Sequence, residues 1–318
     1  MAHYLVTGGA GFIGSHLINE LLREEGSFVT CVDNFDEFYP RLIKESNLDL
    51  FRSNDRFTFY ETDIGDKLAL QKVLASISPD VIVHLAARAG VRPSISAPGD
   101  YYQTNVMGTL HLLDYAKESG IKNFVFASSS SVYGKNPDVP WKEDFSDLQP
   151  ISPYAASKIA GEDLGKVYAH LYDLNFKALR LFTVYGARQR PDLAIHKFAR
   201  LMRESMPIPL FGDGSTYRDY THVSDIVKGI IAAIKYNATS FEIFNIGSGN
   251  PVTLLELVRG LENVMGKEAV IDFQPKQAGD VDRTYADINK AAAFLGYRPA
   301  MNLEAGLKDF WDWWVQRN

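Results

Sequence analysis

The sequence has little of what secreted, membrane-spanning and nucleic-acid-binding proteins require. It contains a single cysteine, Cys31, among 318 residues, which excludes an internal disulfide framework and favours a reducing compartment. No apolar run approaches the roughly 18 residues that cross a bilayer, and no basic-then-apolar leader precedes the first predicted strand. Basic residues are not in excess, because 33 Lys and Arg against 39 Asp and Glu give a net charge of −6. We therefore expect a cytoplasmic protein with no nucleic-acid or membrane partner.

Metal-binding patterns are also missing from the sequence. The seven histidines include no pair at the His-Glu-x-x-His spacing of zinc enzymes, so no metal site is predicted. His84, directly before Leu85, is interpreted as a hydrogen-bonded residue at the end of a strand. Cys31 lies in an apolar run, which is typical of a buried and unreactive thiol.

The first half of the chain alternates short β-branched runs with helical periods, in a composition of 46% apolar and 23% charged residues that is ordinary for a globular protein. Strands are predicted at Tyr4–Val6, Phe28–Val32, Phe57–Tyr60, Val81–Leu85, Phe124–Ala127 and Phe176–Leu181. Helices are predicted at Ile13–Leu22, Lys67–Ile77, Tyr101–Lys117 and Tyr154–Tyr172. The pattern predicts an α/β fold, a Rossmann-type doubly wound parallel sheet that binds ligands at the carboxyl ends of its strands.

The pattern changes after about Gly186, where prolines and glycines separate shorter elements. Two helices are predicted near the end, at Leu254–Val264 and Leu303–Trp314, and the aromatic face of the second is expected to pack in a core. We interpret residues 187–318 as a smaller α/β lobe that binds substrate, packed on an NAD-binding domain of residues 1–186. Segments are expected to be exchanged between the two lobes.

A glycine motif, Gly8-x-x-Gly11-x-x-Gly14, follows the first strand and opens the first helix. Gly8 and Gly11 allow a tight turn and a close approach of the backbone to a diphosphate, and Gly14 allows the helix to pack closely on the sheet. Asp33 ends the second strand 19 residues after Gly14, where a carboxylate binds an adenosine ribose and disfavours a 2′-phosphate. NAD is therefore predicted rather than NADP; a glycine-rich turn without a ligand is the alternative.

Further cofactor contacts are predicted around this motif. Asp63 closes the third strand and fits either an adenine contact or a turn-forming aspartate. The remaining predicted contacts come from the same loops and strand ends: Phe12, Ile13, Asn34, Ile64, Leu85, Ala86 and Ala87.

Tyr154 and Lys158 form the only Tyr-x-x-x-Lys pair among the 16 tyrosines of the chain. The four-residue spacing puts both side chains on one face of a helix, where the ammonium can stabilise an ionised phenol that exchanges protons with a substrate hydroxyl. By chance about one such pair is expected in a chain of this composition. Its position after the glycine motif and after four serines, Ser128 to Ser131, is what gives it weight.

Together these motifs resemble the extended short-chain dehydrogenase/reductase family, and within it the UDP-glucuronate 4-epimerases. The resemblance spans essentially the whole chain. It is carried by the glycine motif and by the segments His84-Leu-Ala-Ala-Arg-Ala-Gly-Val-Arg92, Phe126-Ala-Ser-Ser-Ser-Ser-Val-Tyr-Gly134, Ser152-Pro-Tyr-Ala-Ala-Ser-Lys158, Leu181-Phe-Thr-Val-Tyr-Gly-Ala-Arg-Gln-Arg-Pro-Asp192, Phe211-Gly-Asp-Gly-Ser-Thr-Tyr-Arg-Asp-Tyr220 and Gly279-Asp-Val-Asp-Arg-Thr-Tyr-Ala-Asp287.

The resemblance implies an NAD-dependent epimerase that interconverts UDP-glucuronate and UDP-galacturonate through a 4-keto intermediate. Tyr154, Lys158 and Ser129 take the family's three catalytic positions. Ser130, Ser131 and Thr183 are expected around the sugar carboxylate. The other expected substrate residues are Arg92, Arg190, Arg218 and Asp280.

Residue differences from related enzymes favour the UDP-glucuronate 4-epimerase interpretation but leave alternatives open. UDP-glucuronate decarboxylases usually carry Glu at Ser131, and 4,6-dehydratases commonly carry Asp-Glu at Ser130-Ser131. Galactose-type epimerases usually carry Arg at Gln277. The alternatives remain a UDP-glucose or UDP-N-acetylhexosamine 4-epimerase, a decarboxylase, a 4,6-dehydratase or a non-catalytic NAD-binding regulator.

The resemblance also implies a homodimer through the predicted helices 101–117 and 154–172. Val106, Leu110 and Leu113 are expected either at that interface or against the sheet.

Overall fold

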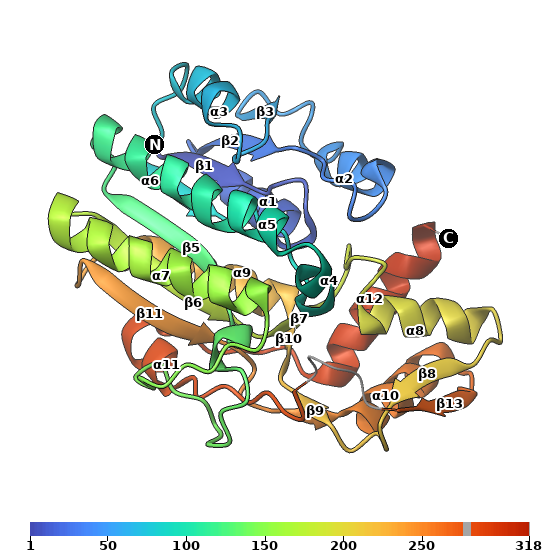
Figure 1. Ribbon diagram of the computed structural model, residues 1–318. Helices are drawn as coiled ribbons and strands as arrows, with labels where there is room; N and C mark the ends of the chain where they lie inside the picture. Colours follow the sequence, from blue (N-terminus) through green and yellow to red (C-terminus); the bar gives the residue numbers. More distant parts are fainter. Residues whose placement is uncertain (276–280, 318) are drawn as a thin grey trace.

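A seven-stranded parallel sheet forms the centre of the computed structural model, which describes residues 1–275 and 281–317 (Figure 1). The strand order is β11-β6-β5-β4-β1-β2-β3, so the chain runs outward from β1 in both directions, as in doubly wound sheets. The strands are β1 (His3–Thr7), β2 (Phe28–Asp33), β3 (Phe57–Glu61), β4 (Val81–His84), β5 (Asn123–Ser129), β6 (Asn175–Leu181) and β11 (Phe241–Ile246). The six predicted strands and the fold class are confirmed, and β11 is an addition.

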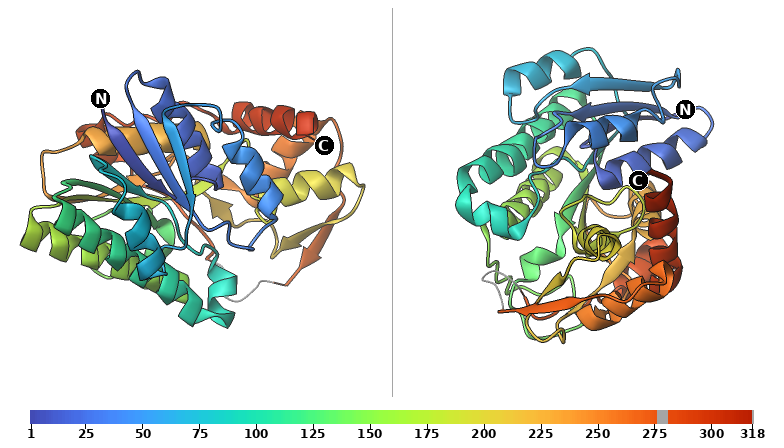
Figure 2. Two further views of the ribbon diagram at one scale, coloured as in Figure 1. Left: turned by 90° about the horizontal axis from the view of Figure 1, so that it is seen from above. Right: turned by 90° about the vertical axis from the view of Figure 1, so that its right-hand side faces the viewer.

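Helices cover both faces of the sheet (Figure 2). Successive strand residues point to opposite faces, so Val6 packs with α1 and α9 on one side and Leu5 with α3, α6 and α7 on the other. The helices of this part are α1 (Phe12–Arg23), α2 (Arg41–Leu48), α3 (Lys67–Leu74), α4 (Val91–Ser96), α5 (Pro98–Tyr101), α6 (Gly108–Ser119), α7 (Pro153–Tyr172), α9 (Val223–Lys235) and α11 (Asn289–Leu295). Short π-helical and 3-10 segments, η1 (Tyr102–Met107) and η2 (Ser130–Tyr133), complete it.

The region expected as one helix from Tyr101 to Lys117 is therefore three consecutive segments, α5, η1 and α6. The hydrophobic period could not reveal the π-helical segment, because one wide turn changes the register without ending the helix.

A smaller lobe lies against the carboxyl ends of the strands (Figure 1). It contains three two-stranded sheets and a separate core in which Leu307, Phe310 and Trp314 are buried, so the expected core role of the last helix is confirmed. Its elements are β7 (Thr183–Tyr185), α8 (Ala194–Arg203), β8 (Ile208–Phe211), β9 (Tyr217–Arg218), β10 (Tyr220–His222), β12 (Val252–Thr253), α10 (Leu254–Met265), β13 (Ile271–Gln274) and α12 (Leu303–Arg317).

Two further sequence expectations concern burial. Cys31 is fully buried, and this burial raises the pKa of its thiol, as expected for an unreactive cysteine. Leu113 is also fully buried against the sheet, so of its two expected positions the structure gives the sheet rather than an interface. Over the residues described, no helix is both long and apolar enough to cross a membrane.

Candidate active site

The predicted cofactor and catalytic residues meet in one cleft at the carboxyl ends of the strands. The cleft has a volume of about 350 Å³. Its lining includes Gly8, Gly11, Phe12, Ile13, Gly14, Asp33, Asn34, Ile64, Leu85, Ala86 and Ala87, together with Ser129, Tyr154, Lys158, Thr183 and Arg190. Asp63 does not line it. Instead its carboxylate accepts hydrogen bonds from the Asn34 side chain at 2.9 Å and from the Gly65 amide at 2.7 Å.

The glycine turn is shaped as a backbone cradle. Gly8 has φ +72°, and a Cβ there would lie 2.6 Å from the Ala86 nitrogen. A Cβ at Gly14 would lie 2.4 Å from the Gly8 carbonyl oxygen, so only glycine allows this packing of α1 on the turn. At Gly11, which precedes α1 and offers no capping side chain, a Cβ would meet only that carbonyl, at 3.1 Å, and the Tyr39 hydroxyl, at 4.0 Å. The start of α1 is thus open to the cleft and fits a diphosphate.

Asp33 lies beside this turn, and backbone amides hold its carboxylate in place. It is 8% exposed and accepts hydrogen bonds from the backbone amides of Ala10 and Phe35. Burial raises the pKa of the Asp33 carboxyl, while these amides and the ammonium of Lys44 act in the opposite direction. Lys44 also lines the cleft, on α2, and the sequence analysis did not find it, because a lone lysine on a polar helix gives no signal.

The Tyr-x-x-x-Lys pair lies on α7, whose start is fixed by Ser152. The Ser152 hydroxyl accepts a hydrogen bond from the Ala155 amide, and Pro153 occupies the first turn. One turn later, Lys158 Nζ donates to the Ala127 carbonyl at 2.6 Å and lies 5.9 Å from the centre of the Tyr154 ring. Helix α7 is thereby tied to the end of β5, next to Ser129.

Burial acts on both ionisable side chains of this pair. It raises the pKa of Tyr154, whereas hydrogen bonding with Ser129 and the positive charge of Arg190 lower it. Burial also lowers the pKa of Lys158 to about 7, against the opposing effect of Glu162. A phenol in contact with a hydroxyl and near two cationic side chains can act as a proton acceptor.

A second cavity of about 190 Å³ adjoins the cleft, and Thr183 lines both. Four of the predicted substrate residues line this cavity: Ser130, Ser131, Thr183 and Arg218. The Ser131 hydroxyl accepts a hydrogen bond from Ser129 Oγ at 2.9 Å, which links the predicted catalytic serine to a predicted substrate residue. Arg218 is anchored by hydrogen bonds to the carbonyls of Tyr217 and Val281.

The other predicted substrate residues have different positions. Arg190 lines the first cleft and forms a bidentate ion pair with Asp192, in which Nε and Nη2 lie 2.9 and 2.7 Å from the carboxylate oxygens. Its third nitrogen, Nη1, has no hydrogen-bond partner among the described residues. Arg92 lines neither cavity, and its guanidinium lies 5.2 Å from the centre of the Phe211 ring. Asp280, like Gln277, lies outside the described residues.

A buried ion pair behind the site was not found from the sequence. Arg180 on β6 donates to both carboxylate oxygens of Glu162, at 3.0 and 2.8 Å, and Ser128 Oγ donates to the same carboxylate. Arg180 and Glu162 are 2% and 4% exposed. The pair joins β5, β6 and α7, the three elements that carry or border Ser129, Tyr154 and Lys158.

His84 has a structural role, as predicted. Its ring nitrogens Nδ1 and Nε2 are hydrogen-bonded to the hydroxyls of Thr7, at 2.7 Å, and Thr109, at 2.9 Å. Burial lowers the pKa of the ring to about 3. A search of residues 1–275 and 281–317 finds no group of three or more His, Cys, Asp or Glu side chains able to hold a metal ion.

Known proteins resemble the chain over nearly its full length. The family model described as GDP-mannose 4,6 dehydratase matches residues 5–310. A UDP-glucuronate 4-epimerase of Thermodesulfobacterium geofontis is 41% identical, with 98% of this chain and 96% of that protein covered. The crystal structure of a Bacillus cereus UDP-glucuronic acid 4-epimerase with UDP-glucuronic acid and NAD superposes with a TM-score of 0.93 at 38% identity, covering 99% and 100% of the two chains.

A second solved structure is of a different epimerase. The UDP-glucose 4-epimerase of Thermotoga maritima, with UDP-glucose, gives a TM-score of 0.90 at 33% identity and covers 99% of both chains.

Proposed function

The chain belongs to the extended short-chain dehydrogenase/reductase family, among its NAD-dependent nucleotide-sugar epimerases, and from this membership we propose that it is a UDP-glucuronate 4-epimerase. The observation that carries the choice of sugar is Arg190. Its side chain lines the cleft with Tyr154, and its positive charge partly opposes the burial that raises the pKa of that phenol. A guanidinium nitrogen without a hydrogen-bond partner among the described residues, in the same cleft as the acid–base residue, suits a substrate carboxylate better than a neutral hydroxymethyl group.

NAD is the cofactor of this proposal. The open start of α1 would hold its diphosphate and Asp33 its adenosine ribose. When bound, NAD would supply the hydride chemistry at carbon 4 of the sugar, and it would be regenerated in each turnover because the hydride returns to the opposite face.

The protein's own part in the reaction is proton transfer. Tyr154 accepts the proton of the 4-hydroxyl and later gives it back. Its phenolate is stabilised by the Ser129 hydroxyl and by the charges of Lys158 and Arg190. Lys158 supports this only in its charged form, and its hydrogen bond to the Ala127 carbonyl favours that form.

Retention of the carboxyl group follows from the neighbouring side chains. A 4-keto uronate is a β-keto acid, which loses carbon dioxide when the breaking bond aligns with the carbonyl. Ser130, Ser131 and Thr183 line the adjoining cavity and can hold the carboxylate out of that alignment together with Arg190. Positions 130 and 131 provide hydroxyls and no acid that could assist elimination or decarboxylation.

The nucleotide part of the substrate is assigned to the smaller lobe. Arg218 lines the second cavity and is already anchored by two carbonyls, which suits a diphosphate contact. The role of Asp280 as a ribose ligand stays a prediction. Arg92 is a weaker candidate, because it lines neither cavity.

The decisive experiment is a product assay with a panel of UDP-sugars, together with the redox state of the bound cofactor. We expect UDP-galacturonate from UDP-glucuronate, with neither net NADH nor carbon dioxide as the main outcome. Arg190→Gln should lower kcat/KM for UDP-glucuronate roughly 10- to 100-fold, because a charged hydrogen bond is lost. Arg200→Gln, in an exposed pair with Glu204 away from both cavities, is the matched control and should change it little. Preference for UDP-glucose, or indifference to Arg190→Gln, would refute the uronate assignment.

We also propose a homodimer through η1, α6 and α7. Large apolar side chains are exposed on η1, at Tyr102 and Met107, and on α7, at Val167 and Leu171. Such a surface favours burial against a second copy. Light scattering on the purified protein tests this, and a monomer at micromolar concentration would contradict it.

A further inference from the structure

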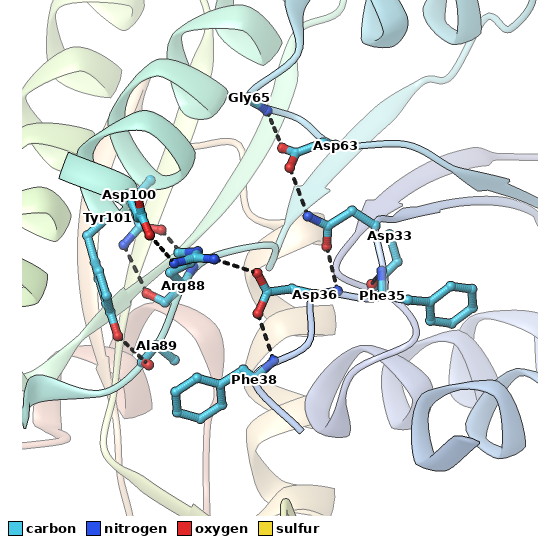
Figure 3. Close-up of polar contacts among 12 residues, drawn as sticks. Asp33, Phe35, Asp36, Phe38, Asp63, Gly65, Arg88, Ala89, Asp100 and Tyr101 are labelled. Atoms are coloured by element: carbon cyan, nitrogen blue, oxygen red, sulfur yellow. Dashed lines mark hydrogen bonds and ion pairs between the residues drawn. The ribbon is translucent and has the colours of Figure 1, made fainter. Parts of the chain in front are cut away.

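An ion pair crosses the cofactor cleft between two loops that are far apart in the sequence. Strand β1 lies between β4 and β2 in the sheet, and the glycine turn follows it. Arg88, on the loop after β4, reaches with Nη2 to Oδ2 of Asp36, on the loop after β2, at 3.0 Å (Figure 3). Both residues line the same cleft as Gly8 and Gly11. The pair therefore joins the loops on either side of the turn that fits the diphosphate.

The Arg88 end of this pair is fixed in place. The side-chain amide of Asn105 on η1 donates to the Arg88 carbonyl at 3.0 Å and accepts from the Arg88 amide at 2.8 Å. The guanidinium is also held by Asp100, whose carboxylate accepts from Nη1 at 2.6 Å. Tyr101 supports the same loop through a hydrogen bond to the Ala89 carbonyl (Figure 3).

The Asp36 end is held as firmly. Asn34 accepts a hydrogen bond from the Asp36 amide at 3.0 Å and donates to Asp63 at 2.9 Å, which ties the loop to the end of β3 (Figure 3). The Asp36 carboxylate accepts a hydrogen bond from the Phe38 amide. The backbone carbonyl of Asp36 accepts another from the Lys44 ammonium. Asp63, for which the sequence left an adenine contact and a turn-forming role open, thus supports this loop.

We propose that the Arg88–Asp36 pair is a latch across the cofactor cleft that slows both the entry and the release of NAD. The inference rests on the NAD-binding part of the proposed function. It assigns Arg88 and Asp36 a positioning role that needs no contact with the nicotinamide or the sugar. An enzyme that regenerates its cofactor in every turnover gains from retaining it.

The strength of the pair suits a latch that can open. The side chains of Arg88 and Asp36 are 35% and 28% exposed, so water screens their attraction. Breaking a pair of this kind changes a rate by roughly up to fivefold. The pair is therefore strong enough to delay exchange and weak enough to be crossed without unfolding the loops.

The test measures NAD exchange in the full-length protein. Bound NAD is displaced by an excess of a competing dinucleotide, and the association rate is measured on protein freed of NAD. We expect Arg88→Gln and Asp36→Asn each to raise the release rate two- to fivefold, with a similar rise in association, so that Kd changes less than either rate. The double variant should be no faster than either single one. Arg200→Gln breaks a more exposed pair, with Glu204 at the end of α8 and away from the cleft, and should change nothing.

The other possible results of this experiment would overturn the latch, the proposed function or both. A higher Kd in Arg88→Gln with an unchanged Asp36→Asn would mean that Arg88 binds the dinucleotide directly, which would overturn the latch. Unchanged exchange rates in an active enzyme would overturn the latch alone. A protein that binds no NAD would overturn both the latch and the proposed function, whereas NAD exchange that follows the prediction without epimerase activity would overturn only the function.

Discussion

Removing one partner of the buried Arg180–Glu162 pair should be among the most damaging single changes in this protein. In Glu162→Gln the guanidinium of Arg180, whose side chain is 2% exposed, stays buried but loses its ionised partner. Its Nη1 already lacks a hydrogen-bond partner, so the remaining charge has little compensation. An uncompensated buried charge costs about 3–5 kcal/mol, and Arg180→Met should cost a similar amount by leaving the carboxylate alone.

The double variant Glu162→Gln/Arg180→Met separates charge from packing. Since it leaves no buried charge, we expect it to recover much of the loss, as buried ion pairs replaced by neutral groups often do. At about 2 °C per kcal/mol for a chain of this size, each single variant should lower Tm by roughly 6–10 °C. Calorimetry with excess NAD measures this, with Glu204→Gln in an exposed pair as a control that should stay within about 1 kcal/mol. Single variants that lose less than about 1 kcal/mol, or losses that simply add in the double variant, would refute the reasoning.

Three other predictions concern chemistry, the cofactor and pH. Tyr154→Phe should lower kcat at least 100-fold and leave NAD bound, because the proton acceptor is lost but the cleft is not; a binding measurement beside the assay checks both. Gly14→Ala should weaken NAD binding and stability, since its Cβ would lie 2.4 Å from a carbonyl oxygen, whereas Gly99→Ala, with open space around it, should do neither. His84 stays neutral in the folded protein because its pKa is lowered to about 3. The unfolded chain takes up this proton near pH 6.5, so stability should fall from pH 6.5 toward 3, by up to about 1.4 kcal/mol per pH unit from this group. Urea unfolding midpoints that do not change between pH 7.5 and 5 would contradict this last prediction.

The sequence predicts what depends on local pattern. Six strands, the glycine turn and the placement of Tyr154 and Lys158 on one helix follow from β-branched runs, glycine spacing and helical period. The same local signals bring the predicted cofactor residues to one edge of the sheet, because parallel strands end together there.

What the sequence did not reveal depends on long-range pairing. Arg180 looks like an interruption in an apolar strand, and only the fold brings Glu162 against it. Arg88 and Asp36 are 52 residues apart and meet because β1 lies between their strands. Arg92 was expected on a loop but lies in α4, with its guanidinium 5.2 Å from the centre of the Phe211 ring, and its substrate contact stays a prediction.

The late position of β11 in the sequence affects how the sheet forms during synthesis. β11 pairs with β6 along six residues, from Phe241–Phe176 to Ile246–Leu181, so the partner of β6 is synthesised some 60 residues after it. Until then the emerging chain carries β6 as an open edge, with unpaired backbone groups that attract other strands. We therefore expect a fragment that ends near Gly186 to keep β6 as an open edge and to aggregate more readily than the full chain. Completion of the sheet therefore waits until the first elements of the smaller lobe, β7 to β10, have been synthesised.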